Sequence, residues 1–203
     1  MTITDTTLKN IIDESLTKAI SYQEYRTLVQ NLVADGKSTG EEQTEDLSNY
    51  SMLNDRRMKR LDKTTKLTEE AIAKIKSYHG DVTWLVLTES WCGDAAQTMP
   101  VINKVAELSN NITLKVVLRD ENEALMNEFL TNGGKSIPKL IAIDNTSGNV
   151  IGDWGPRPTK ATKLVNDYKA EHGTLTPEFK EDLQVWYNKD KGQNTVDDLL
   201  KLI

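Results

Sequence analysis

Apolar residues along the chain follow two different patterns. Four runs have the length and continuity of strands, and they lie at residues 82–87, 112–118, 140–143 and 150–154. Three segments between or after these runs space their apolar residues at helical intervals, at residues 96–108, 121–130 and 159–172. A turn-rich connection joins the last two runs, which is typical of a hairpin. The order β-α-β-α-β-β-α predicts an α/β fold in which helices cover both faces of a central mixed sheet.

The first 80 residues carry only helical patterns. They divide into four segments, around residues 11–20, 21–34, 41–62 and 68–79. Ser21 and Glu24 form a capping box before the second segment, and Thr68 caps the fourth. We therefore expect an all-helical N-terminal extension over residues 1–80, followed by an α/β domain over residues 81–172.

Residues 173–203 are expected to form a C-terminal helical segment packed on the domain. Thr176 caps one helix and Pro177 occupies its first position, where proline is tolerated because no intrahelical N–H bond is lost. A terminal helix is expected over residues 195–203. No low-complexity linker and no internal repeat separates these parts.

Composition and charge narrow the possible function classes. With 37% apolar and 28% charged residues, the 203-residue chain has the make-up of a globular protein. Its net charge of −6 argues against general binding of nucleic acid or of anionic membranes. No apolar stretch approaches the roughly 18 residues that span a bilayer. Residues 1–10 lack a secretory pattern and the chain has one cysteine, so we expect a reducing, cytoplasmic location.

Both histidines directly precede a glycine, a pattern typical of helix C-termini. We expect His79 and His172 to lie at helix ends, where a cation interacts favourably with the last carbonyl groups. One cysteine and two such histidines provide no metal-ligand spacing. No metal is therefore expected.

The only cysteine lies where a strand turns directly into a helix. The helix after Cys92 leaves its first N–H groups unpaired, and its dipole favours a thiolate. We therefore expect the pKa of Cys92 to lie below the free value of about 8.5, although the charges of Asp94 and Glu89 would oppose this shift. The alternative is a buried, inert cysteine. The neighbouring Trp91 and Gly93 argue against it, because such a turn normally faces solvent.

Four features in chain order resemble the thioredoxin superfamily. They are Trp91-Cys92-Gly93-Asp94 (the motif Trp-Cys-Gly-x-Cys), Pro100 (the proline of the active-site helix), Ser136-Ile137-Pro138-Lys139 (the cis-proline loop) and Gly155 after the last strand. The resemblance covers roughly residues 80–172. It implies a bacterial thioredoxin-like protein with a thioredoxin-like fold, extended by N-terminal helices and carrying a single active-site cysteine.

The resemblance also implies roles for individual residues. Cys92 would be the nucleophile, and the substrate would bind against Trp91, Gly93, Asp94, Ile137 and Pro138. The backbone of Ile137 would pair with an extended peptide or with the cysteine-containing part of glutathione. Ala95 stands where the family has its resolving cysteine, and Val86 where it often has a buried acid. Dithiol chemistry by one molecule is therefore excluded.

Basic residues near the site are interpreted as solvated. Arg119 and Arg157 follow strands that lead to the site, and either could hold a substrate carboxylate. For both, a solvated surface charge is the favoured interpretation. The basic run within residues 56–66 is interpreted as a solvated helix face.

Two functions of different classes fit these observations. In the first, a monothiol oxidoreductase attacks mixed disulfides through Cys92, a small external thiol such as glutathione resolves the product, and no cofactor is needed. In the second, the fold is a redox-inactive module that binds a peptide or protein partner, as the loss of the resolving thiol at Ala95 suggests. We favour the first, because a thiol at a helix start keeps its nucleophilicity without a second cysteine. Neither function involves nucleic acid or a membrane.

Overall fold

A mixed four-stranded sheet forms the centre of the molecule, in the order β2-β1-β3-β4. The structure is a computed structural model that describes residues 3–203; residues 1 and 2 of the expected extension lie outside the described part. The strands are β1 (Val82–Thr88), β2 (Ile112–Leu118), β3 (Lys139–Asp144) and β4 (Val150–Trp154). β1 runs parallel to β2 and antiparallel to β3, which forms the predicted hairpin with β4.

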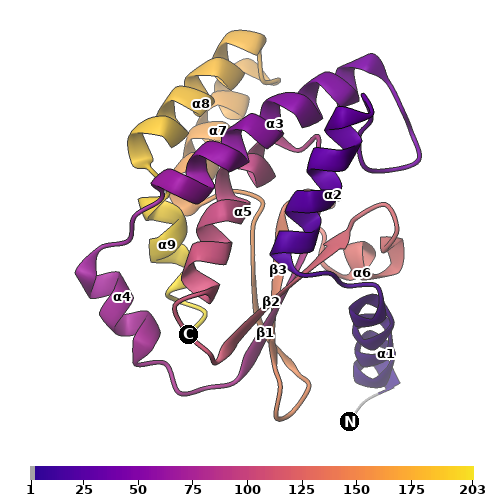
Figure 1. Cartoon of the computed structure of the whole chain (residues 1–203), viewed down its shortest axis with the longest axis vertical. Coiled ribbons are helices and arrows are strands. Elements are labelled where there is room, and N and C mark those ends of the chain that lie inside the picture. The colour runs from indigo at the N-terminus through magenta and orange to yellow at the C-terminus, as the bar shows by residue number, and fades with distance from the viewer. Residues whose placement is uncertain (1–2) are drawn as a thin grey trace.

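Both faces of the sheet are covered. Neighbouring side chains of a strand point to opposite faces, and every position but one is buried in β1 and likewise in β3. The helices that connect or follow the strands are α5 (Gly93–Ala106), α6 (Glu123–Glu128) and α7 (Thr159–His172). In Figure 1, α5 and α6 lie on opposite sides of the sheet. The α/β fold predicted from the sequence is confirmed.

The N-terminal part is helical, as predicted. Its helices are α1 (Ile3–Thr17), α2 (Tyr22–Ala34), α3 (Glu45–Thr64) and α4 (Glu69–Lys76). The capping box of Ser21 and Glu24 is present, and the Thr68 hydroxyl accepts the Ala71 N–H at the start of α4. Helix α3 packs along α5, so the longest helix of the extension lies against the helix that follows the cysteine (Figure 1).

Three predicted helix ends are wrong. The first segment does not stay helical to Ile20, because the N–H and C=O of Ile20 bond to Val116 at the free edge of β2. Helix α5 begins at Gly93 instead of residue 96, because Cys92 itself caps it. Helix α4 ends at Lys76, so His79 is not at a helix end. His172, by contrast, is the last residue of α7 and precedes Gly173 at φ 76°, as predicted.

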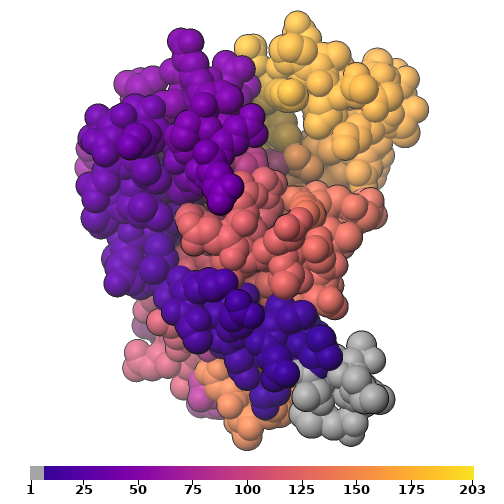
Figure 2. Space-filling view, turned by 90° about the vertical axis from the view of Figure 1, so that its right-hand side faces the viewer, coloured from indigo at the N-terminus to yellow at the C-terminus, as the bar shows by residue number. Residues whose placement is uncertain are grey.

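The C-terminal segment consists of α8 (Pro177–Asp190) and α9 (Gln193–Leu199). Thr176 caps α8 and Pro177 opens it, as predicted. Helix α9 packs on α5 and contributes Val196 and Leu199 to the main apolar core. Helix α8 forms a smaller core with α7 around Val165 and Leu183. Figure 2 shows the golden C-terminal helices and the purple N-terminal helices on either side of a hollow.

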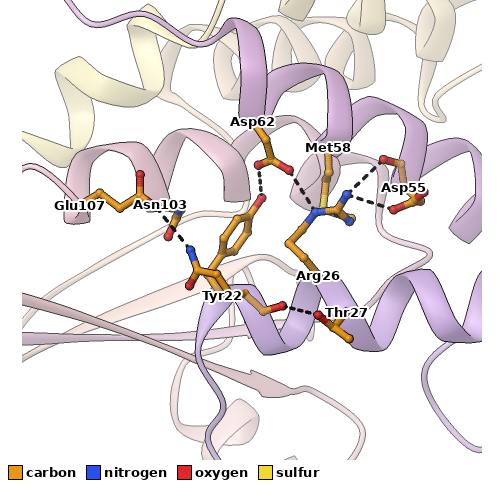
Figure 3. Close-up of polar contacts among 9 residues, drawn as sticks. Tyr22, Arg26, Thr27, Asp55, Met58, Asp62, Asn103 and Glu107 are labelled. Carbon is orange, nitrogen blue, oxygen red and sulfur yellow. Dashed lines mark hydrogen bonds and ion pairs between the residues drawn. The ribbon is translucent and has the colours of Figure 1, made fainter.

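A polar cluster joins α2 to α3 (Figure 3). Arg26 donates to Asp62 at 3.1 Å and pairs with Asp55 at 3.0 Å. The Tyr22 hydroxyl donates to Asp62 at 2.6 Å, and burial raises the pKa of Tyr22, so this hydroxyl stays protonated. Removing one partner of a buried ion pair leaves an uncompensated charge. The cluster therefore fixes α2 against α3, and with it the part of α3 that faces the cysteine.

The core extends through all three predicted parts of the chain. The main apolar cluster contains Ile12 and Tyr25 of the extension, the strands of the sheet, and Leu199 of α9. The division into 1–80, 81–172 and 173–203 stays a prediction. Among the described residues, no helix has both the length and the apolar character needed to cross a membrane.

Candidate functional site

Cys92 lies at the junction of β1 and α5, where it is the N-cap of the helix. Its sulfur accepts the Ala95 backbone N–H at 3.4 Å, which satisfies one of the unpaired donors of the first turn. The thiol in turn donates to the backbone carbonyl of Ile137 at 3.2 Å. The structure thus brings the predicted nucleophile against the predicted substrate loop.

Cys92 is only 9% exposed, and burial is the largest influence on its acidity. Burial, followed by the charge of Asp94, raises the pKa of Cys92 to about 12, although the N–H groups of Ala95 and Asp94 and the charge of Arg157 act to lower it. The prediction of a solvent-facing thiol with a lowered pKa is therefore wrong. Desolvation penalises the thiolate more than the helix start favours it.

Asp94, in the first turn of α5, links this helix to the loop after β4 and to α8. Arg157, from the loop between β4 and α7, pairs with its carboxylate at 2.6 Å. The hydroxyl of Tyr187 on α8 donates to the same carboxylate at 3.0 Å. Burial raises the pKa of Asp94, while Arg157 and the Tyr187 hydroxyl favour its charged form. The interpretation of Arg157 as a solvated surface charge is wrong, because its side chain is 24% exposed and pairs with the carboxylate of Asp94, which is 13% exposed.

The loop opposite Cys92 contains a cis peptide bond between Ile137 and Pro138. Gly155, after β4, packs on this loop at φ +116°, a conformation that favours glycine. A Cβ atom at Gly155 would lie 2.1 Å from the Pro138 carbonyl oxygen. Because Gly155 has no Cβ atom, the backbone that follows β4 can lie directly against the backbone of Pro138 and Lys139.

The extension holds the cysteine loop through a buried hydrogen-bond network that sequence reasoning missed. The Ser90 hydroxyl accepts the Thr39 N–H at 2.9 Å and lies 2.6 Å from the Ser51 hydroxyl. The Ser90 N–H donates to the Thr39 hydroxyl at 2.8 Å, and the Ser90 carbonyl accepts from Asn54 at 2.9 Å. The partners are 36 to 51 residues away in sequence, so no local signal could have revealed them.

Trp91 and Glu89 also have partners within the fold. The guanidinium of Arg119 lies 4.8 Å from the ring centre of Trp91, a cation–π contact that corrects the interpretation of Arg119 as a solvated charge. Glu89 is fully buried and its carboxylate accepts the Asp120 N–H at 2.9 Å. Burial raises the pKa of Glu89, against the opposing effects of the Thr39 hydroxyl and the Asp120 N–H.

A groove of about 650 Å³ opens between α3 and α8 and reaches the cysteine loop. It corresponds in place to the hollow between the purple and golden segments in Figure 2. Its lining comprises Leu47, Tyr50, Leu53 and Arg57 of α3, Trp91 and Gly93 of the loop, and Pro177, Lys180, Glu181 and Gln184 of α8. We name this the α3–α8 groove. Two of the residues predicted to bind substrate, Trp91 and Gly93, thus face a real cleft.

Within the described part of the chain, no group of three or more His, Cys, Asp or Glu side chains is placed to hold a metal ion. The only candidate nucleophile that this site provides is the thiol of Cys92 at the start of α5. Beside it lie a carbonyl group that the thiol contacts and an anion, Asp94, held by Arg157.

Comparison with known proteins gives three findings. A sequence model of the Thioredoxin_9 family, described as thioredoxin, matches residues 40–169, a range that includes α3 and α4 as well as the sheet. The crystal structure of an HIV epitope-scaffold aligns with a TM-score of 0.57 at 16% identity, covering 90% of this chain and 97% of that one. A protein of unknown function from Pseudomonas aeruginosa aligns with a TM-score of 0.55 at 16% identity, covering 90% and 96%. At 16% identity, both structures support a similarity of fold only. A search of curated proteins finds no match.

Proposed function

We propose that this chain, which belongs to the thioredoxin superfamily, is a thiol oxidoreductase that acts through Cys92 alone. The observation that carries the proposal is the position of the sulfur. It accepts an N–H group at the start of α5 and touches the backbone of the loop at Pro138. A thiolate formed there would be stabilised by the helix start and would face the surface where a substrate backbone can pair.

The reaction proceeds in two thiol–disulfide exchanges. The Cys92 thiolate attacks the sulfur of a mixed disulfide between a target and glutathione, so that a sulfur–sulfur bond forms to Cys92 and the target leaves as a thiolate. The thiolate of a second glutathione then attacks the disulfide on Cys92, releasing oxidised glutathione and the Cys92 thiolate. Glutathione is the reductant, and no step requires a second cysteine, metal or cofactor.

Substrate binding would favour the reactive form of Cys92. In the free protein the thiol donates to the Ile137 carbonyl, and a hydrogen bond donated by a thiol stabilises its protonated form. A peptide N–H of the substrate that pairs with this carbonyl would take the place of the thiol. The thiol proton would then leave to solvent more easily, because the Ala95 N–H and the charge of Arg157 favour the thiolate.

The second candidate is a redox-inactive module that binds a peptide or protein. The burial of Cys92 and its raised pKa favour this function, because few molecules carry a thiolate at neutral pH. Under either function, the partner is a small thiol, a protein mixed disulfide or a protein segment. A reducing cytoplasm suits the oxidoreductase, since its single thiol must stay reduced to act.

The test compares turnover of a glutathione mixed disulfide by the wild type and by Cys92→Ser, with glutathione in excess. We expect activity in the wild type and only the uncatalysed rate in Cys92→Ser. Equal rates would refute the oxidoreductase and leave the binding module. As a further variant, Ala95→Cys should gain activity towards protein disulfides, because it supplies the missing resolving thiol.

A further inference from the structure

Arg57 is a half-buried cation that faces the α3–α8 groove and has no acidic partner in the part of the chain that the structure describes. Among the described residues its recorded side-chain hydrogen bond is to the neutral amide oxygen of Asn54, at 3.1 Å. Burial, followed by the charge of Arg60, lowers the pKa of Arg57, and no carboxylate offsets these effects. Arg26 on α2, by comparison, has two carboxylate partners, Asp55 and Asp62. A partly desolvated guanidinium without a counter-ion is a ready site for an external carboxylate.

The position of Arg57 places such a carboxylate beside the reactive loop. Its guanidinium nitrogen lies 3.8 Å from the point where a Cβ atom on Gly93 would sit. Gly93 and Trp91, the two neighbours of Cys92 in sequence, both line the groove. A ligand held by Arg57 would therefore lie directly next to the cysteine loop.

The remaining lining combines apolar surface with a second cation. Tyr50 and Leu53 of α3 are 54% and 40% exposed, and they give the groove an apolar surface for the stem of a ligand. On the opposite wall, Lys180 carries a positive charge and Glu181 a negative one. With Arg57, the groove is net positive in a chain of net charge −6. The local charge thus favours an anionic ligand with an apolar or peptide body.

We propose that the α3–α8 groove binds a small peptide thiol that carries carboxylates, of the glutathione type, and that Arg57 holds one of these carboxylates. This inference rests on the proposed function, because it names the class of thiol that would exchange with Cys92. A volume of about 650 Å³ is that of a small-molecule pocket. Its two walls, α3 and α8, lie outside the predicted α/β domain, and Trp91 and Gly93 of that domain complete the lining.

Arg57 also has a structural contact that the test must separate from binding. Its bond to Asn54 supports a residue that holds the Ser90 carbonyl. The substitution Arg57→Gln keeps an amide donor for Asn54 and removes the charge. Arg57→Lys keeps the charge and loses the forked geometry that matches a carboxylate. Arg56, exposed on the same helix, provides the matched control Arg56→Gln, which lowers the net charge equally.

The experiment measures binding of S-methylglutathione, which cannot exchange disulfides, by titration calorimetry on the full chain. We expect Arg57→Gln to raise Kd at least about tenfold, since a charge-assisted hydrogen bond is lost. Arg57→Lys should recover part of the affinity, and Arg56→Gln should bind like the wild type. Esterifying the carboxylates of the ligand should weaken binding to the wild type more than binding to Arg57→Gln.

Two results would overturn the inference: no binding of S-methylglutathione to the wild type, or equal Kd values for Arg57→Gln and Arg56→Gln. The Cys92→Ser variant separates this test from that of the proposed function. If Cys92→Ser binds the ligand through Arg57 while the wild type turns over no mixed disulfide, the ligand site stands and the oxidoreductase fails. If turnover is present at subsaturating glutathione but unchanged in Arg57→Gln, the oxidoreductase stands and the ligand site fails.

Discussion

Replacing Asp94 by Asn should make Cys92 more acidic. The carboxylate is the second largest cause of the raised pKa of Cys92, after burial. Asn keeps an oxygen that can accept the Tyr187 hydroxyl, so the packing of α8 is maintained. The substitution also frees the charge of Arg157, which then acts on the thiolate without its counter-ion. Both changes favour the charged form of the thiol, so its pKa must fall.

A lower pKa has two opposing effects on the reaction rate of Cys92: more of the thiol is ionised, but each thiolate is less nucleophilic. With a pKa of about 12, roughly one thiol in 100,000 is ionised at pH 7, because each pH unit changes the ratio tenfold. Removing a neighbouring like charge lowers a pKa by about 1 to 3 pH units. The thiolate fraction of Cys92 then rises about tenfold to 1,000-fold. Each thiolate is less nucleophilic, with a Brønsted slope of about 0.4–0.5, so the net gain in rate is about threefold to 60-fold.

The assay follows the reaction of the single thiol with a small neutral aromatic disulfide, whose released thione is coloured, at several pH values above neutrality. The matched control is Asp46→Asn, because Asp46 holds the same position in the first turn of α3 as Asp94 does in α5. We expect the control to react like the wild type. A rate for Asp94→Asn equal to or below that of the wild type at these pH values would refute the assignment of Asp94 as the charge that suppresses the thiolate.

Three further substitutions test how the site is held. Glu89→Gln should gain stability relative to the wild type as the pH rises above about 4.3, which is the pKa of a glutamate in the unfolded chain. The reason is that the folded state binds the Glu89 proton more tightly, so wild-type stability falls with pH; urea unfolding at several pH values measures it. Ser51→Ala should cost about 1–3 kcal/mol in urea unfolding, because it removes a buried partner of Ser90. Gly155→Ala should cost at least about 3 kcal/mol by thermal unfolding, because its Cβ would collide with the Pro138 carbonyl.

Each of these substitutions has a matched control in the chain. Glu123→Gln should show the opposite pH trend to Glu89→Gln, because Lys135 lowers the pKa of Glu123. Ser48→Ala removes an exposed hydrogen bond and should cost about 1 kcal/mol or less. Gly133→Ala, at φ +76° in open space, should cost only the backbone strain of about 1–2 kcal/mol. Equal losses within a pair, or a pH trend shared by both glutamates, would contradict the contacts described.

The elements that sequence reasoning predicted well are those governed by local chemistry. The strand Ile112–Leu118 and the helix Thr159–His172 were predicted with the bounds found, because a continuous apolar run and a helical spacing end at clear turn residues. The caps at Ser21 and Thr176 depend on side chains bonding within three residues. Ile20, by contrast, leaves its predicted helix because its partner is Val116, far away in sequence.

The sequence indicates which residues lie around Cys92, but not the electrostatics of the thiol; the roles assigned to these residues stay predictions. The sequence places Cys92 at a helix start, and the helix effect was correctly identified as favouring the thiolate. It does not reveal how completely the fold buries the sulfur, and burial decides the pKa. Arg157 and Arg57 look alike as single basic residues in the sequence. Only the fold shows that the first has a carboxylate partner and the second faces a groove without one.

The most direct test of the account is to look for the covalent intermediate on Cys92. The full chain is treated with a glutathione mixed disulfide, quenched with acid and analysed by mass spectrometry, with and without added glutathione. The account predicts a glutathione adduct at Cys92 that disappears when glutathione is added, since the small thiol resolves it. If Cys92 forms no adduct while S-methylglutathione still binds, the protein is a binding module and its thiol takes no part in exchange.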